Sequence, residues 1–301
     1  MSRPRVALAT CRHHDGFVAG DDEALASRLG GLGYHAERPC WDDDRVDWSS
    51  LDAVVLRTTW DYHERLDEFL AWIDRVAART RLFNPPEVVR GNVDKRYMRR
   101  LEGAGVPIVP TSWLEAPVSA DDLRAALASF GAPAGVIKPV VGAGASGMLV
   151  FGERELDAAG AHADDQARRH GGALVQPLLQ SVRERGELSV VLIDGLCTHA
   201  VRKAPAEGEW RVQIEFGGAY TLETPGDRER QVAADAVRAL CPGEAPLYAR
   251  IDLVEAPGVG PAVIEAELVE PELFFAWAPE AADELGRRLA RRLGIPVPSG
   301  A

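Results

Sequence analysis

Short apolar runs alternate with amphipathic helical segments along most of this 301-residue chain. Near the start, 5–10 (RVALAT) and 52–57 (DAVVLR) have the composition of buried strands, whereas 21–33 and 64–79 carry apolar residues at helical spacing. Further strands are predicted at 135–141, 148–151, 173–178, 188–193, 198–203, 247–254 and 262–269, and further helices at 93–102 (capped by Asn92) and near 154–170, 228–240 and 279–293. This alternation predicts an α/β (α+β) fold.

The balance of charge excludes one large class of function. The chain has 34 Lys and Arg against 46 Asp and Glu, a net charge of -12, which argues against a protein that coats nucleic acid. Its four cysteines form no C-x-x-C pair, and no apolar stretch approaches the length of a membrane span. We therefore expect a cytoplasmic protein with no nucleic-acid partner and no membrane partner.

Three carboxylates are predicted to share one face of a hairpin near the C-terminus. The segments LYARIDLV and AVIEAELV both alternate, and APGVGP between them is suited to a turn. Centring the turn there places Asp252 opposite Glu265 and Arg250 opposite Glu267, with Leu253 opposite Ile264 on the apolar face. Three neighbouring carboxylates favour a bound Mg²⁺, although a solvated strand face with one Arg–Glu pair is the alternative.

The segment GVIKPVVGAGASGMLVF contains a glycine-rich loop between two predicted strands. Gly142, Gly144 and Gly147 match the dinucleotide fingerprint G-x-G-x-x-G, but a strand follows the loop where that fingerprint requires a helix. The loop instead suits a flap over phosphates, and Lys138 just upstream can point at the same phosphates. The alternative for the loop is an ordinary hairpin, and the alternative for Lys138 is a lysine at the surface.

A second hairpin is predicted around Asp194-Gly195 in ELSVVLIDGLCTHAVRKA. Its simplest register places Glu187 opposite Arg202, with Lys203 on the other face of the sheet. For an isolated hairpin, a structural ion pair explains this arrangement as well as a site does.

Several motifs occur in the order seen in ATP-grasp ligases, and they span essentially the whole chain: Asn92-Val93-Asp94-Lys95, Val136-Ile137-Lys138-Pro139, GAGASG, Val175-Gln176-Pro177, Gly186-Glu187, Arg211 with Gly217-Gly218, Arg250-Ile251-Asp252 and Glu265-Ala266-Glu267. The chain resembles the glutathione synthetase-like branch of that superfamily. Within this branch it is most similar to the O-ureido-serine cyclo-ligases of cycloserine biosynthesis, with which it shares features such as VDW (46–48) and DKRY (94–97). The resemblance implies an ATP-grasp fold with an N-terminal β/α substrate lobe at 1–91 and two lobes that clasp ATP, at 92–175 and 176–301.

The resemblance also assigns roles to residues at the matching positions. Lys95 and Lys138 would hold ATP phosphates under the loop of Gly142, Gly144, Ala145, Ser146 and Gly147. Gln176, Pro177, Leu178 and Leu179 would contact adenine, and Glu187 the ribose. Asp252, Glu265 and Glu267 would ligate Mg²⁺, two ions in all, and Arg211 and Arg250 would neutralise charge on the transferred phosphoryl group.

The substrate residues are predicted from the rule that ligands bind at the carboxyl ends of the strands in such sheets. In the first lobe this rule nominates Thr10 to Asp15 and the segment of Arg57, Thr59, Trp60, Asp61 and Tyr62, with Arg57 pairing with a substrate carboxylate. Packing and solvated loops are the alternative explanation for these residues. Arg202 and Lys203 complete the candidate set.

These inferences predict an ATP- and Mg²⁺-dependent carbon–nitrogen ligase that activates the carboxylate of a small amino-acid-like substrate as an acyl phosphate. An intramolecular cyclo-ligase is favoured. The alternatives are an intermolecular carboxylate–amine ligase of the peptide or glutathione type and a non-catalytic nucleotide-binding module. A homodimer is compatible with each of them.

Overall fold

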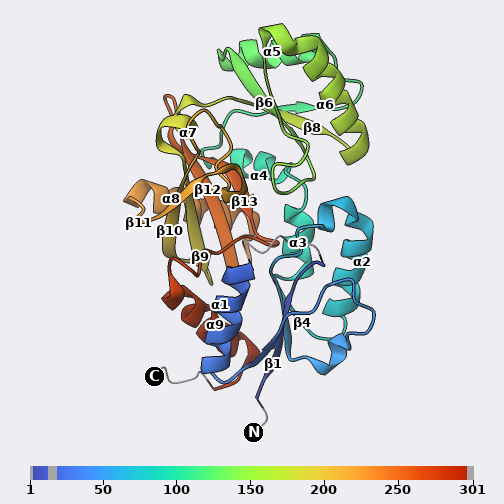
Figure 1. Ribbon diagram of the computed structural model, residues 1–301, viewed down its shortest axis with the longest axis vertical. Helices are drawn as coiled ribbons and strands as arrows, with labels where there is room; N and C mark the ends of the chain where they lie inside the picture. The colour runs from blue at the N-terminus through green and yellow to red at the C-terminus, as the bar shows by residue number, and fades with distance from the viewer. Residues whose placement is uncertain (1–2, 13–18, 297–301) are drawn as a thin grey trace.

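The computed structural model describes residues 3–12 and 19–296 and contains three β-sheets (Figure 1). The first sheet is parallel, with strand order β2-β1-β3-β4: β1 Arg5–Ala9, β2 His35–Glu37, β3 Ala53–Leu56 and β4 Arg81–Phe83. Its connections are α1 (Ala19–Gly31), the 3₁₀ turns η1 (Trp48–Ser50) and η2 (Tyr62–Glu64), and α2 (Leu66–Ala77). The parallel strands are joined through helices, as such a sheet requires.

A second, antiparallel sheet occupies the top of Figure 1, with strand order β5-β8-β6-β7. It comprises β5 (Ser112–Leu114), β6 (Ala134–Pro139), β7 (Leu149–Gly152) and β8 (Ala173–Pro177), with η3 (Glu153–Glu155) and the helices α5 (Ala120–Phe130) and α6 (Leu156–His170). Its apolar core draws only on residues between 114 and 175, so this lobe packs as a unit of its own.

The third sheet is antiparallel and has the order β11-β10-β9-β12-β13. Its strands are β9 (Glu187–Ile193), β10 (Leu196–Ala204), β11 (Ala219–Glu223), β12 (Tyr248–Ala256) and β13 (Gly260–Glu267), and the neighbouring helical elements are α7 (Gln180–Arg185), η4 (Ile214–Phe216), α8 (Asp227–Leu240) and α9 (Pro279–Leu293). Helix α9 lies beside α1 in Figure 1, and Leu25, Leu29, Leu285 and Leu289 share one core with β1 and β9. The first and third sheets are therefore joined by a common core.

Two short helices connect the first lobe to the second, α3 (Pro86–Asn92) and α4 (Tyr97–Gly103). The single helix predicted over 93–102, with Asn92 as its cap, is wrong, because Asn92 ends α3 and its side chain bonds to a strand instead. Its Nδ2 donates to Ala266 O (2.9 Å) and its Oδ1 accepts from Leu268 N (2.7 Å). This clamp fixes the end of β13 against the connecting helices. None of the helices in the described residues combines the length and apolar composition needed to cross a bilayer.

Candidate nucleotide and metal site

The three carboxylates of the C-terminal hairpin meet on one face of β12 and β13. Asp252 pairs with Glu265 and Arg250 with Glu267, as predicted, and the carboxylate oxygens of Asp252, Glu265 and Glu267 lie within 4.8 Å of one another. The predicted pairing of Leu253 with Ile264 is wrong, because Leu253 pairs with Val263 and Ile264 is the extra residue of a β-bulge. The turn is also shorter than predicted, and the bulge restores the register at the carboxylates.

Residues from the connecting segment hold this hairpin in place. The hydroxyl of Tyr97 accepts a hydrogen bond from Ala266 N (2.9 Å), beside the clamp made by Asn92. Asn84 makes a similar clamp, since its Nδ2 donates to Tyr248 O and Leu268 O. Ala266 stands between Glu265 and Glu267, so these hydrogen bonds position both carboxylates. Neither Asn84 nor Tyr97 is predicted from the sequence as a residue that positions the site. The only signal for each is a polar group beside apolar residues, at the end of a strand for Asn84 and in a helix for Tyr97.

Lysine and arginine side chains surround the carboxylates. Lys95 Nζ lies 3.1 Å from Glu265 Oε1 and donates to Gly142 O at 2.8 Å, so it joins the carboxylates to the glycine-rich loop. Arg250 is buried and bonds to Asp252 through Nε (3.0 Å) and Nη2 (3.1 Å), and it also forms an ion pair with Glu267. The cluster therefore balances most of its negative charge with side chains from three parts of the chain.

The electrostatics of the three carboxyl groups differ. Burial opposes ionisation of Asp252, yet Arg250 and Lys203 hold the pKa of its carboxyl well below its usual range. Burial likewise opposes ionisation of Glu265, but Lys95 and Lys138 lower its pKa. Burial, with Glu265 and Asp252 nearby, raises the pKa of Glu267 to about 7 despite Arg250. A divalent cation would favour the ionised form of Glu267, so the donor set fits Mg²⁺.

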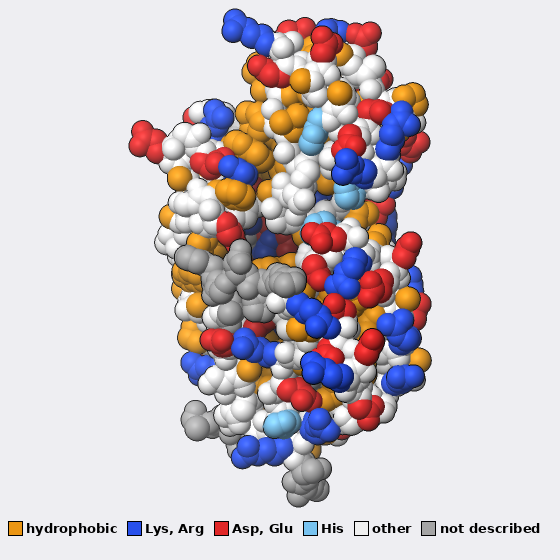
Figure 2. All heavy atoms as spheres, turned by 45° about the vertical axis from the view of Figure 1, so that its right-hand side comes forward, with side chains coloured by type: hydrophobic (Ala, Val, Ile, Leu, Met, Phe, Trp, Pro, Cys, Tyr) orange, Lys and Arg blue, Asp and Glu red, His pale blue; other side chains and the backbone are white. Residues whose placement is uncertain are grey.

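A cavity between the second and third sheets brings together most of the residues predicted to contact ATP. It is lined by Val136, Lys138, Ala145, Met148, Gln176, Pro177, Leu178, Leu179, Val182, Arg183, Glu187, Trp210, Arg211, Val212, Gln213 and Ile264. Figure 2 shows the surface hollowed below the lobe built on β5–β8, with basic and acidic side chains visible in its depth. An apolar cavity with a few polar groups is the usual form of a small-molecule site.

Within this cavity, Lys138 and Gln176 are buried polar side chains. Burial lowers the pKa of the Lys138 ammonium, while Glu265 and Glu187 oppose that shift. Gln176 Nε2 donates to Thr111 Oγ1 (3.1 Å), and its Oε1 has no hydrogen-bond partner in the described residues. Leaving a buried acceptor unpaired is costly, so a bound donor group would stabilise this arrangement.

The glycine-rich loop borders the cavity but points only Ala145 into it; Gly142, Gly144, Ser146 and Gly147 do not line it. Gly144 (φ +58°), Ala145 (φ +62°) and Gly147 (φ +71°) all adopt the left-handed conformation. At Gly147 a Cβ atom would lie 2.3 Å from Gln166 Oε1, so both backbone angle and space require glycine there.

The predicted register of the hairpin at 187–203 is wrong by one residue. A β-bulge between Cys197 and His199 shifts the pairing, so that Lys203, not Arg202, stands opposite Glu187. Lys203 is consequently buried in the site, 3.2 Å from Glu187 and 3.0 Å from Asp252. Arg202 lies on the other face, where it pairs with Glu223, and is not brought to the site.

The prediction that Arg57 pairs with a substrate carboxylate is also contradicted. Its guanidinium is buried, donating to Asp22 Oδ1 and Asp21 Oδ2 at 2.9 Å each and to Pro271 O. These bonds tie the start of α1 and the chain after β13 to the end of β3. Arg57 therefore has a structural position, with its charge already neutralised.

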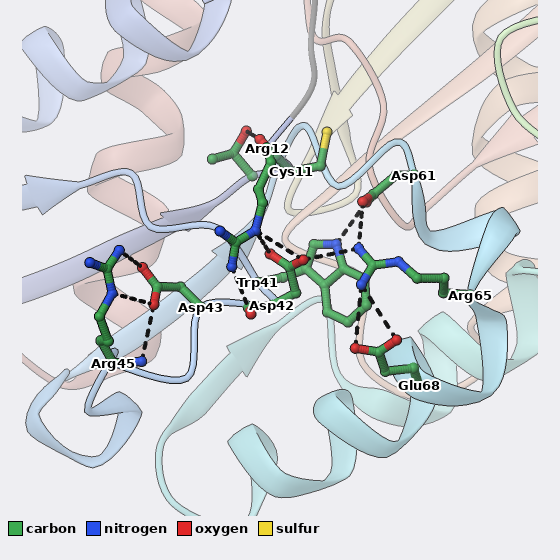
Figure 3. A network of polar contacts seen from close by, with 10 residues as sticks. Cys11, Arg12, Trp41, Asp42, Asp43, Arg45, Asp61, Arg65 and Glu68 are labelled. Atoms are coloured by element: carbon green, nitrogen blue, oxygen red, sulfur yellow. Dashed lines mark hydrogen bonds and ion pairs between the residues drawn. The ribbon is translucent and has the colours of Figure 1, made fainter.

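The other candidate substrate residues of the first lobe make contacts of different kinds. Trp60 Nε1 donates to Glu270 O (3.0 Å), whereas Asp61 accepts from Trp41 Nε1 and Arg65 Nη2 in a local network of polar contacts (Figure 3). Thr59 is buried, and its hydroxyl has no hydrogen-bond partner within residues 3–12 and 19–296, while Tyr62 packs against Phe69. Thr10 to Arg12 lie in the described residues, but positions 13–15 of the predicted substrate loop lie outside them.

The hydroxyl of Tyr62 is affected by the charges of the carboxylate cluster. Burial and then Glu270, Glu267 and Glu265 raise the pKa of its hydroxyl well above the usual value.

Arg211 lines the nucleotide cavity, where it forms an ion pair with Glu209 and its guanidinium carbon lies 3.6 Å from the centroid of the Phe216 ring. Of the two arginines predicted to neutralise phosphoryl charge, the structure places only Arg250 among the carboxylates.

Two family models match the chain. Residues 6–84 match "D-cycloserine synthetase DcsG, N-terminal domain", and residues 115–257 match "Prokaryotic glutathione synthetase, ATP-grasp domain". The cycloserine biosynthesis protein DcsG of Streptomyces lavendulae is 33% identical over 87% of this chain and 90% of its own length. A glutathione synthetase of Mesorhizobium japonicum is 25% identical over 63% of this chain and 58% of its own length.

Solved structures agree with the sequence comparisons. The crystal structure of D-cycloserine synthetase DcsG matches with a TM-score of 0.88 at 31% identity, over 96% of this chain and 99% of that one. A D-alanine–D-alanine ligase from Bacillus anthracis matches with a TM-score of 0.67 at 16% identity, over 95% of this chain and 93% of that one, which shows a shared fold.

Fold and site together define an ATP-grasp protein, a class that uses ATP and Mg²⁺. Within that class, the chain belongs to the family of the cycloserine biosynthesis protein DcsG and is an ATP-dependent carbon–nitrogen ligase.

Proposed function

We propose that this enzyme closes a ring on a small amino-acid-like substrate: it activates the substrate carboxylate with ATP, and a nitrogen of the same molecule then attacks. The observation that carries the proposal is the direct connection between the nucleotide cavity and the carboxylate cluster. Glu187 lines the cavity, and Lys203 pairs with both Glu187 and Asp252. The similarity to DcsG supports ring closure, with an O-ureido-serine as the substrate to test first.

The protein side chains account for binding and charge neutralisation. Adenine would lie against Gln176 to Leu179 and ribose at Glu187, in the cavity lined by these residues. Lys95 and Lys138 would neutralise the phosphates under the glycine-rich loop. Asp252, Glu265 and Glu267 would hold Mg²⁺, two ions in our proposal, which when bound supplies positive charge to the triphosphate.

The reaction then follows from the chemistry of carboxylates. A carboxylate oxygen attacks the γ-phosphorus of ATP, the bond to ADP breaks, and an acyl phosphate forms. The nitrogen nucleophile attacks the acyl carbon, loses a proton, and phosphate leaves. Arg250, buried beside Asp252 and Glu267, would orient the carboxylate and balance the charge that develops there. The lobes 1–91, 92–175 and 176–301 would supply the substrate site and the two walls of the ATP site.

Substrate profiling tests the proposal. The enzyme is incubated with ATP, Mg²⁺ and a panel of amino-acid carboxylates that includes O-ureido-serine, with and without an added amine. We expect ADP and phosphate release without added amine, and a product formed from the one carboxylate alone. Release that requires a second amine would instead show an intermolecular ligase, the reaction type of the glutathione synthetase relatives. Absence of Mg²⁺-dependent ADP formation with every carboxylate would contradict both.

A further inference from the structure

A second cavity lies beside the carboxylate cluster, at the meeting of α1, η4, β11 and the segment 272–277. Asp21, Ile214, Glu215, Tyr220, Glu272 and Trp277 are among the residues that line it. Among the described residues, it shares no lining residue with the nucleotide cavity. None of the candidate substrate residues of the first lobe that the structure describes lines it either, so the sequence-based expectations for those residues do not account for it.

The walls of this cavity combine acids with aromatic rings. Three carboxyl side chains line it, and no lysine or arginine does so among the described residues. Tyr220 and Trp277 have ring centroids 5.6 Å apart, and Phe274 packs edge-on against both. Carboxylates and aromatic faces both attract an ammonium group, and together they disfavour an anion.

Two of the carboxylates have no partner in the part of the chain that the structure describes. Asp21 is fully engaged, because it accepts from Arg57 Nη2, Leu273 N and Phe275 N. In contrast, no hydrogen bond or ion pair to the carboxylates of Glu215 and Glu272 is found among the described residues. Burial raises the pKa of the Glu272 carboxyl to about 7, although Arg250 opposes the shift, so a bound cation would stabilise its charged form.

The cavity adjoins the reaction centre through Arg250. Its Nη1 donates to Glu272 O (3.2 Å), and its guanidinium carbon lies 5.6 Å from the centroid of the Phe274 ring. The same side chain bonds to Asp252 and Glu267. A carboxylate held at Arg250 would thus have an acidic, aromatic pocket next to it, on the segment that Arg250 contacts.

We infer that this second cavity binds the ammonium group of the substrate, with Glu272 and Glu215 as its counter-charges and Trp277 and Tyr220 as its walls. The inference rests on the proposed function, since it assumes that the carboxylate to be activated lies at Arg250. It adds a requirement: the substrate carries a free ammonium group close to that carboxylate, and an acylated amine is rejected.

Binding is tested without catalysis by saturation-transfer NMR. The probe is alaninamide, which has an ammonium group but no carboxylate to activate, and N-acetylalaninamide is its uncharged partner. The variants are Glu272→Gln and the exposed Glu215→Gln, with Glu280→Gln, an exposed residue of α9, as the matched control. We expect alaninamide to bind the wild type and the control equally well. It should bind Glu272→Gln and Glu215→Gln about 5- to 30-fold more weakly, and N-acetylalaninamide should bind none of the proteins.

Equal binding of alaninamide by all four proteins, or binding of the acetylated probe, would overturn the inference. Because Glu215 is exposed, its variant keeps the test valid if Glu272→Gln fails to fold. A protein that binds alaninamide as described but forms no ADP with any carboxylate would contradict the proposed function alone. Ligase turnover with unchanged amino-acid KM in Glu272→Gln and Glu215→Gln would contradict the ammonium site alone.

Discussion

Lys203 on β10 and Asp252 on β12 form a buried ion pair across the intervening strand β9, with Nζ 3.0 Å from Oδ2. Ser189 of β9 completes the contact by donating to Asp252 Oδ1 at 2.6 Å. Burial opposes the charge on Lys203, but Asp252 and Glu187 raise the pKa of its ammonium above the usual value. This pair joins the predicted ribose-binding glutamate to the carboxylate cluster.

Replacing Lys203 should destabilise the fold. Lys203→Met would leave Glu187 and one side of Asp252 without a counter-charge, at a cost of about 3 kcal/mol in the free energy of unfolding. The matched control is Arg202→Met on the same strand, whose partly exposed ion pair with Glu223 contributes about 1 kcal/mol or less. Urea unfolding midpoints without added metal measure both. Equal midpoints for the two variants would contradict the buried-pair interpretation.

Glu265→Gln tests the metal site. Removing one carboxylate charge should lower kcat by about 100-fold or more at saturating ATP, because charge on the transferred phosphoryl group is then less well balanced. Circular dichroism should show an intact fold. Glu255→Gln, on β12 but near the turn, is the control and should keep wild-type turnover. Wild-type kcat in Glu265→Gln would show that Glu265 is not a metal ligand.

Arg57 should matter for stability. Arg57→Met leaves Asp21 and Asp22 buried without their shared cation, so we expect a loss of about 3–5 kcal/mol in the free energy of unfolding. Arg5→Met, which breaks an exposed ion pair with Glu37, should change it by less than about 1 kcal/mol. Thermal and urea denaturation distinguish the two. A stable Arg57→Met protein with a raised KM for the carboxylate would restore the substrate role that the structure contradicts.

Stability in metal-free buffer should depend on the protonation of Glu270. Burial, and then Glu267, raises the pKa of its carboxyl from 4.5 to about 8, against the effect of Lys95. The folded state thus binds this proton more tightly than the unfolded chain. Its stabilising contribution is complete below about pH 4.5 and is lost as the pH rises through about 8.

Glu270→Gln keeps the shape of the protonated side chain and removes its titration. In buffer with a chelator, we expect the decline in unfolding free energy between pH 5 and 8 to shrink by about 1–3 kcal/mol relative to wild type. A residual decline should remain, because the pKa of Glu267 is also raised. The exposed Glu280→Gln should decline like the wild type. Identical pH profiles for Glu270→Gln and wild type would show that Glu270 does not cause the decline in unfolding free energy.

The two hairpins show which strand registers can be predicted from the sequence and which cannot. Alternation along 247–269 predicts the pairing of Asp252 with Glu265, because burial of the apolar face fixes which residues share the other face. The same reasoning fails at 187–203, since the bulge at Cys197 and His199 leaves no mark in composition. A one-residue slip there moves Lys203 into the site and Arg202 out of it.

Other features depend on contacts between distant segments. The charge on Arg57 is satisfied by Asp21 and Asp22 at the start of α1, an acidic pair whose partner the sequence does not specify. The edge strand β11 is mostly exposed and lacks an apolar pattern, so it was not predicted, yet its Tyr220 lines the second cavity. The local sequence pattern predicts strands and their charged faces. Packing between distant segments then determines which charged side chains are left to bind a ligand.

Transfer of oxygen from substrate to phosphate tests the central claim most directly. The enzyme is given ATP, Mg²⁺ and O-ureido-serine whose carboxylate carries ¹⁸O, and the released phosphate is analysed by mass spectrometry. If the carboxylate attacks the γ-phosphorus, one carboxylate oxygen leaves with each phosphate, so each phosphate formed from fully labelled substrate contains one ¹⁸O atom. Phosphate without ¹⁸O, formed at the rate of ADP, would show that water attacks ATP and that the protein does not activate this carboxylate.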